Sequence, residues 1–129
     1  CPARPLPCPP QAVTVAAGQP LAGVPERSAR FELNYTAGRN WNAALEWQAL
    51  SATPASDRVA DELPGYAIWN LRWQKRFTPR GFGLASALVR VDNLLDRRYS
   101  GSAIVNDGAR RYYESAPGRS VWVGVDLEW

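Results

Sequence analysis

Residues 66–77 of this chain have the sequence YAIWNLRWQKRF, and they decide what kind of fold it can form. Every second residue is apolar, with one interruption at Lys75, and from residue 70 on the residues between are polar. A period of two is the side-chain period of a β-strand with one apolar and one polar face. The apolar positions are Ala67, Trp69, Leu71, Trp73 and Phe77, and the polar positions are Asn70, Arg72, Gln74 and Arg76.

Four further stretches alternate in the same way, at residues 29–37, 41–50, 83–95 and 119–129. The five predicted strands are about nine to thirteen residues long. Strands of soluble proteins are usually nearer five or six residues, whereas a tilted membrane-spanning strand needs roughly 9–11. Strand length therefore favours the wall of a membrane barrel. The less regular stretch 83–95 is expected to place Ala85, Ala87, Val89, Val91 and Leu95 on its apolar face.

The connections between these stretches alternate between short and long. Residues 38–40 and 78–82 make short connections, and residues 51–65 and 96–118 make long ones. Outer-membrane barrels combine short periplasmic turns with long extracellular loops. We therefore predict an all-β fold, an antiparallel β-meander of about five long strands that forms a segment of a transmembrane β-barrel. Residues 1–26 are predicted to be a Pro-rich, extracellular loop-like segment, and residues 27–129 to supply the strands.

Composition excludes several functions. Among 129 residues there is no histidine, which removes Ser-His-Asp and Cys-His catalysis and a zinc site of the Cys/His kind. A net charge of +3, spread evenly, does not indicate a nucleic-acid partner. We expect no enzyme activity, no cofactor and no metal site. Because the chain also lacks methionine, we expect it to be part of a longer protein. Cys1 and Cys8 could form a local disulfide or be incidental.

Aromatic residues gather near the short connections. Tyr35, Trp41, Phe77 and Phe82 lie there in the sequence, and the predicted topology puts Trp129 at the same level. Amphipathic rings of this kind occupy the headgroup boundary of a membrane. The pattern predicts an aromatic girdle at one end of the strands.

Several short motifs resemble those of TonB-dependent outer-membrane receptors. Residues 91–99 (VDNLLDRRY) resemble the N-L-F-D-x-x-Y segment near the end of these receptors, and residues 117–119 (PGR) resemble the P-G-R that opens their final strand. Residues 23–25 (GVP) and 64–66 (PGY) also fit, and the resemblance covers residues 21–129. Residues 106–119 look most like the ferric-siderophore and ferric-citrate branch. The motif positions are Asn93, Leu94, Asp96, Tyr99, Pro117, Gly118 and Arg119.

The C-terminus resembles the signal that the barrel-assembly machinery recognises in its substrates. Gly124, Leu127 and the terminal aromatic Trp129 fill three of its positions. The fourth position, usually polar, is occupied here by Trp122, which is a departure from the pattern. A terminal aromatic residue would anchor the last strand at the periplasmic interface.

The resemblance implies the C-terminal barrel part of a receptor in the outer membrane of a Gram-negative bacterium, serving uptake of iron chelates. It also implies outer-membrane lipid, the rest of the barrel and its plug, and the barrel-assembly machinery as partners. The TonB energy-coupling system would act through an N-terminal part that we do not find in this sequence. Loop 96–118 would face outward, where Arg and Tyr suit an anionic ferric chelate. The predicted ligand-binding residues are Arg110, Arg111, Tyr112 and Tyr113.

Two other interpretations remain open from the sequence. A small soluble β-sandwich could bind glycans through exposed Trp side chains, since there are six Trp residues and regularly spaced turns. Alternatively, five strands could form a barrel by oligomerisation. Asp57 and Asp61, or Asp92 and Asp96, have a spacing that could be arranged for acid–base chemistry. We expect no catalytic site there, and the resemblance gives Asp96 a structural role at a strand end.

Overall fold

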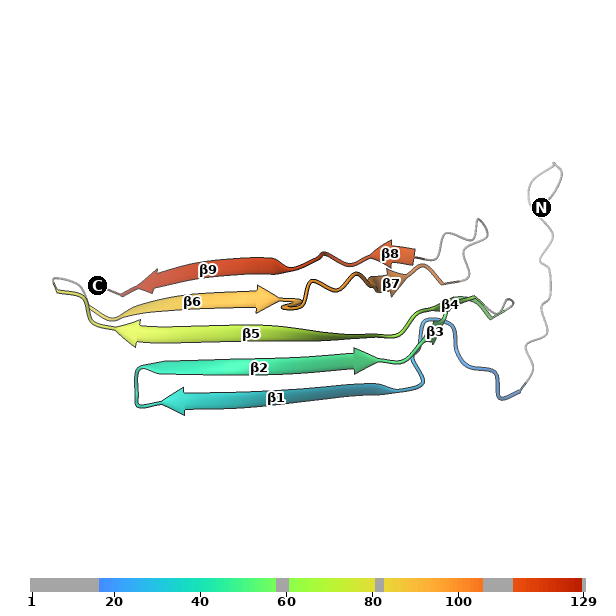
Figure 1. Ribbon diagram of the computed structural model, residues 1–129, viewed down its shortest axis with the longest axis horizontal. Helices are drawn as coiled ribbons and strands as arrows, with labels where there is room; N and C mark the ends of the chain where they lie inside the picture. Colours follow the sequence, from blue (N-terminus) through green and yellow to red (C-terminus); the bar gives the residue numbers. More distant parts are fainter. Residues whose placement is uncertain (1–16, 58–60, 81–82, 106–112, 129) are drawn as a thin grey trace, which may run out of the picture.

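The computed structural model of the chain describes residues 17–57, 61–80, 83–105 and 113–128, which form β-strands and their connections (Figure 1). Five long strands make one antiparallel sheet in the order β1-β2-β5-β6-β9, so each long strand pairs with the next one along the chain. This confirms the predicted all-β meander of five strands. The sheet is open, with β1 and β9 at its edges. The strands are β1 (Ser28–Ala37), β2 (Trp41–Leu50), β5 (Tyr66–Phe77), β6 (Ala85–Asp92) and β9 (Ser120–Leu127).

The register places alternate residues of all five strands on common faces. Directly paired residues always have the same parity, as in Phe31 with Trp47 and Trp47 with Trp69. Since paired residues in an antiparallel ladder point to the same side, the odd-numbered side chains share one face and the even-numbered ones share the other. We call these the odd face, which is largely apolar, and the even face, which is largely polar.

The strand predicted over residues 83–95 is shorter than expected, because β6 ends at Asp92. Asn93 has a φ of 52°, in the left-handed region, and so turns the chain out of the ladder. Leu95, which was expected on the apolar face of this strand, therefore lies beyond the strand end with its side chain exposed. The alternation breaks at this end, because Asn93 is polar at an apolar position and Leu94 is apolar at a polar one, and it resumes at Leu95, so the prediction extended past the break.

The two long connections contain strands that were not predicted. Strands β3 (Thr53–Pro54) and β4 (Glu62–Leu63) pair within one connection, and β7 (Ser100–Ala103) pairs with β8 (Tyr113–Ser115) within the other. Both small sheets lie at the end of the large sheet opposite the short turns (Figure 1). Strands of two to four residues are too short to show a period of two in the sequence.

The described part of the chain is a single layer with almost no core. On the five long strands, the buried side chains are Ala44, Ile68 and Ala85. Another small cluster, of Ala55 and Leu63 with Ala103 against it, lies among the loops. A β-sandwich would need a second sheet packed on the first, and the described ranges contain no such layer. The large sheet therefore leaves both of its faces uncovered.

Candidate functional site

The odd face is a broad, exposed apolar surface of the described structure. On edge strand β9, Val123 is 74% exposed and its odd-numbered neighbours are also exposed. On the opposite edge, Phe31 is 56% exposed, and Leu33 and Tyr35 are similar. The register joins these residues through the apolar side chains of β2, β5 and β6 into one continuous surface. An exposed apolar surface of this extent marks a site that contacts a partner or a membrane.

Aromatic side chains on the odd face form two groups. Near the short turn 38–40, the rings of Tyr35 and Trp41 meet edge to face with centroids 5.4 Å apart, and Trp73 lies in the same ladder row as Tyr35. Farther from the turns, Phe31, Trp47 and Trp69 lie in one row across three strands, and the Trp47 and Trp69 rings are 6.3 Å apart. Sequence reasoning missed this second group, because only the register between strands reveals it. Phe82 and Trp129, predicted members of the girdle, lie outside the described residues.

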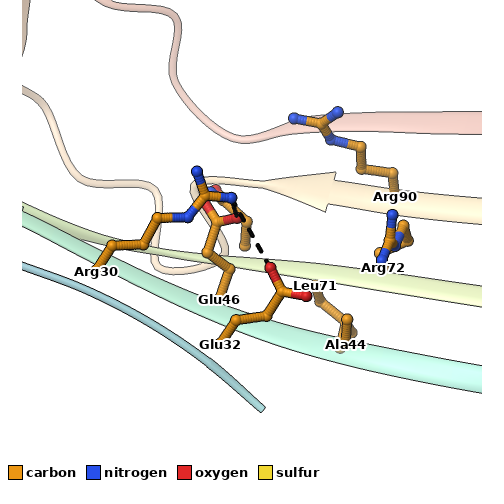
Figure 2. A pocket seen from close by; sticks show the side chains of 8 residues that line it. Arg30, Glu32, Ala44, Glu46, Leu71, Arg72 and Arg90 are labelled. Atoms are coloured by element: carbon orange, nitrogen blue, oxygen red, sulfur yellow. Dashed lines mark hydrogen bonds and ion pairs between the residues drawn. The ribbon is translucent and has the colours of Figure 1, made fainter. Parts of the chain in front are cut away.

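The even face carries a charged depression with a volume of about 340 Å³ (Figure 2). Glu32 and Glu46 are directly paired across β1 and β2, which would be unfavourable if they stood alone. Arg30 offsets this repulsion, with its Nη2 atom 2.5 Å from Glu46 Oε2 and 3.8 Å from Glu32 Oε2. Asn34 and Asn70 complete this half by donating to Glu32 Oε1 (2.7 Å) and Glu46 Oε1 (3.1 Å).

The other half of the depression is basic. Arg72 and Arg90 are directly paired across β5 and β6. Arg90 Nε lies 2.7 Å from Asp92 Oδ1, whereas Arg72 forms no ion pair with the carboxylates that the structure describes. Trp122, the next residue of this row on β9, is 62% exposed on the same face. Two adjacent guanidinium groups beside an exposed indole can contact anionic groups.

The motif around Asn93 forms a turn built on a buried side chain. Asn93 is 2% exposed, and its Oδ1 accepts the Arg97 N–H at 2.9 Å while its Nδ2 donates to the Arg97 carbonyl at 2.8 Å. Its own N–H donates to Asn70 Oδ1 at 2.9 Å. Leu94 N–H donates to the Trp69 carbonyl at 2.7 Å. This network fixes the end of β6 against β5.

The structure also brings two motif segments together. Asp96 Oδ1 accepts the N–H of Arg119, 23 residues later, at 2.8 Å. A Cβ atom at Gly118 would lie 2.9 Å from the same oxygen, so the backbone at Gly118 passes close to the carboxylate. Pro117, the remaining residue of this segment, comes directly before Gly118. The contact joins the exit of β6 to the entry of β9.

Tyr99, the last motif residue, packs on Tyr66 at the start of β5. Their ring centroids are 4.3 Å apart. Burial of the hydroxyl raises the pKa of Tyr99 above 10.0, and Tyr66 and Asp92 add to the rise. The chain before Tyr66 is also tightly placed, because a Cβ atom at Gly65 would lie 2.7 Å from the Leu50 carbonyl oxygen.

The first motif segment packs between the two long connections. Gly23 has a φ of 80°, and its N–H donates to the Pro54 carbonyl at 2.7 Å. A Cβ atom at Gly23 would lie 2.8 Å from Val105 Cγ1. Glycine fits both the left-handed conformation and the close approach.

Other predicted site residues are placed in part. Gly124 lies on the even face paired with Leu88, and Leu127 ends β9 on the odd face. Tyr113 begins β8, where its hydroxyl lies 3.4 Å from the Glu62 carbonyl oxygen. Arg110, Arg111 and Tyr112 lie outside the described residues. Their role in ligand binding stays a prediction.

A comparison of the sequence with models of known protein families found no match. Among the described residues there is no helix that is long and apolar enough to cross a membrane. Nor do three or more acidic or Cys side chains in the described ranges gather in a way that could hold a metal ion.

Proposed function

We propose that this chain is part of the barrel wall of a TonB-dependent outer-membrane receptor for the uptake of iron chelates, either ferric siderophores or ferric citrate. The observation that carries the proposal is the uncovered apolar odd face, continuous over five long strands, with a polar even face behind it. In this account lipid covers the odd face, and the even face lines the lumen.

The open sheet supports a wall segment rather than a finished barrel. About eight strands are the practical minimum for closing a barrel, and the sheet has five. The outer edges of β1 and β9 would offer unpaired backbone groups, which are an aggregation hazard in water. We therefore assign these edges to pairing with further strands of the same receptor, which would enclose the plug.

The arrangement of connections gives the wall an orientation. The short turns after β1 and β5 would face the periplasm, and the connections that carry the two small sheets would face outward. Under this orientation the segment 106–112, with Arg110, Arg111 and Tyr112, belongs to an outward loop.

Transport can be tested in cells grown under iron limitation. Deletion of the gene is expected to abolish or strongly reduce uptake of radiolabelled ferric citrate or of one member of a panel of ferric siderophores. A plasmid that carries the complete reading frame should restore uptake. Unchanged uptake of every chelate in the deletion strain would contradict the proposed function.

The loop prediction needs a separate variant. Replacing Arg110 and Arg111 together by Ala is expected to raise the KM for uptake of an anionic chelate, because two cations are removed from the outward loop. The matched control replaces Arg39 and Arg80, which lie at the short turns, and should leave the KM unchanged. Equal uptake kinetics in the two double variants would rule out a special role for Arg110 and Arg111.

A further inference from the structure

Strand β6 leaves the sheet with one residue too many for a regular ladder. Leu71 pairs with Val91, so a continued ladder would pair Trp69 with Asn93. The Trp69 carbonyl accepts instead the N–H of Leu94, at 2.7 Å. Asn93 and Leu94 together therefore oppose Trp69, as in a β-bulge whose first residue has the left-handed conformation.

This bulge deprives the Asn93 N–H of the Trp69 carbonyl, the acceptor that a continued ladder would supply. The N–H belongs to an almost fully buried residue, because Asn93 is 2% exposed. A buried N–H without a partner costs free energy comparable to a lost hydrogen bond. The side chain of Asn70 supplies the missing acceptor, since its Oδ1 accepts the Asn93 N–H at 2.9 Å.

The orientation of the Asn70 amide decides whether it can accept this bond. An amide side chain has an acceptor oxygen on one side and a donor NH₂ group on the other. Asn70 lies directly opposite Glu46 in the ladder, and its Nδ2 donates to Glu46 Oε1 at 3.1 Å. An ionised carboxylate can only accept hydrogen bonds. Glu46 therefore favours the orientation in which Nδ2 faces β2 and Oδ1 faces the bulge.

Arg30 holds the Glu46 carboxylate by its other oxygen. The Nη2 atom of Arg30 lies 2.5 Å from Glu46 Oε2, so each carboxylate oxygen has its own partner. Glu46 is also the more enclosed of the two glutamates, with 22% of its side chain exposed against 35% for Glu32. Arg30, Glu46 and Asn70 thus form a chain of hydrogen bonds that runs from β1 across β2 and β5 to the bulge.

The turn that follows the bulge depends on Asn93 in its turn. The Asn93 side chain accepts the Arg97 N–H at 2.9 Å and donates to the Arg97 carbonyl at 2.8 Å. Within this turn Asp96 also has a φ of 52°, and its Oδ1 accepts the Arg119 N–H at 2.8 Å. The backbone at Asn93 therefore sets both the exit of β6 and the start of the connection to β9.

We propose that Glu46 is a positioning residue for this turn: through Asn70 it holds the acceptor that the bulge at Asn93 requires. The role depends on contacts within the described sheet and is independent of the proposed barrel wall. It couples the even-face depression, which Glu46 lines, to the connection between β6 and β9. A change in the Glu46 side chain should therefore affect the Asn93 backbone on the far side of β5.

Hydrogen exchange of backbone amides tests the proposal, because the Asn93 N–H is itself the bonded group. The protein expressed from the complete reading frame is compared with Glu46→Leu and Glu46→Gln. Leucine has a similar size and no acceptor, so exchange at Asn93 and Arg97 is expected to rise about tenfold, the effect of one typical lost hydrogen bond. Glutamine keeps a carbonyl oxygen for Asn70, so it should preserve most of the protection.

Glu32→Leu is the matched control. It removes a carboxylate from the same ladder row, beside the same Arg30, but Glu32 contacts Arg30 and Asn34 rather than Asn70. Exchange at Asn93 should stay unchanged in this variant. The amides of residues 86–90 in β6 give an internal reference for opening of the whole sheet.

Equal exchange at Asn93 in the wild type and in Glu46→Leu would overturn the proposal. A rise of the same size in Glu32→Leu or in Glu46→Gln would also overturn it, because the lost charge and not the hydrogen bond would then be the cause. A uniform rise over residues 86–97 in Glu46→Leu would leave Glu46 with a general part in sheet stability and no positioning role.

Exchanging the two partners provides a second test if Glu46→Leu does not assemble. Asn70→Asp keeps an acceptor for the Asn93 N–H but cannot donate to Glu46, and it places two carboxylates side by side. Exchange at Asn93 should therefore rise. Adding Glu46→Gln restores a donor opposite the introduced carboxylate and should lower the exchange again. No recovery in the double variant would contradict the positioning role.

Discussion

The side chain of Asn93 and the absence of a side chain at Gly65 each determine the local backbone structure. Asn93 combines a φ of 52° with two side-chain hydrogen bonds to Arg97 in an almost fully buried place. Gly65 passes within contact distance of the backbone at residues 50–52. Both lie where a long strand joins a long connection, so small changes there act on the ends of the sheet.

Replacing Asn93 by Ala is expected to lower the free energy of unfolding by about 2–3 kcal/mol, through two lost hydrogen bonds and a residue less suited to positive φ. Asn34→Ala is the matched control, because the Asn34 side chain is exposed and bonded to Glu32 alone among the described contacts. The control should change stability by no more than about 0.5 kcal/mol. Urea unfolding in detergent checks both. Equal losses of unfolding free energy in the two variants would show that the turn at Asn93 does not contribute more to stability than an exposed side chain.

Gly65→Ala is expected to cost about 1–3 kcal/mol, because the added Cβ atom would meet the Leu50 carbonyl oxygen at 2.7 Å and backbone atoms of residues 51 and 52 at 2.9 Å. Gly124→Ala is its control, since the nearest atom there is the Leu88 Cβ at an ordinary 3.9 Å. The same unfolding measurement applies. A neutral Gly65 variant would show that the connection between β4 and β5 can move away.

On the even face, charged side chains stabilise one pair of neighbouring strands and destabilise another. Arg30 lies between two paired glutamates, whereas Arg72 and Arg90 are paired like charges. The first arrangement stabilises the β1–β2 ladder. In the second, Asp92 already forms an ion pair with Arg90, so the repulsion that weakens the β5–β6 ladder is reduced and its uncompensated charge is that of Arg72.

Two substitutions of the same type should therefore have opposite signs. Arg30→Gln is expected to lower the free energy of unfolding by about 0.5 kcal/mol, since Glu32 and Glu46 lose their shared cation. Arg72→Gln should raise it by a similar amount, and the gain should shrink with added salt as the repulsion is screened. Thermal unfolding at two salt concentrations measures both. A loss of stability for Arg72→Gln would mean that its charge is already compensated within the protein.

The contact between Tyr99 and Tyr66 joins the residue before β7 to the start of β5. It also makes the stability of the protein depend on pH. The pKa of Tyr99 is raised in the folded protein, so its neutral form is favoured there. Its contribution is complete below pH 10.0, the usual pKa, and is lost as the pH rises through the raised value. Tyr99→Phe should remove this part of the alkaline decline in unfolding free energy. An identical decline in both proteins would contradict the assignment.

The long strands could be predicted from the sequence because their alternation is a local signal. The bounds of β2 and β5 agree with the prediction, and those of β1 and β9 are close to it. The end of β6, the small sheets and the contact between Asp96 and Arg119 could not be predicted. They depend on a positive φ, on very short pairings and on a hydrogen bond between residues distant in sequence. The even-face depression could not be predicted either, because its lining residues come from four strands and meet only through the register between them.

At the scale of the whole molecule, the described chain is a single apolar–polar sheet with two open edges. Such a sheet cannot remove its odd face from water by itself, because neither small sheet covers it. Lipid on one face and a lumen on the other would satisfy both sides without a conventional core. The proposed wall therefore requires that the odd-numbered side chains contact lipid and the even-numbered side chains contact water.

One measurement along a single strand tests this directly. Cysteines are placed singly at residues 121–126 of β9 in a background in which Cys1 and Cys8 are replaced by Ser. Each is labelled with an environment-sensitive fluorophore and exposed to lipids with nitroxides on their acyl chains. The account predicts strong quenching at residues 121, 123 and 125 and weak quenching at residues 122, 124 and 126. Similar quenching at neighbouring positions, or no lipid quenching at all, would contradict a sheet that forms a membrane wall.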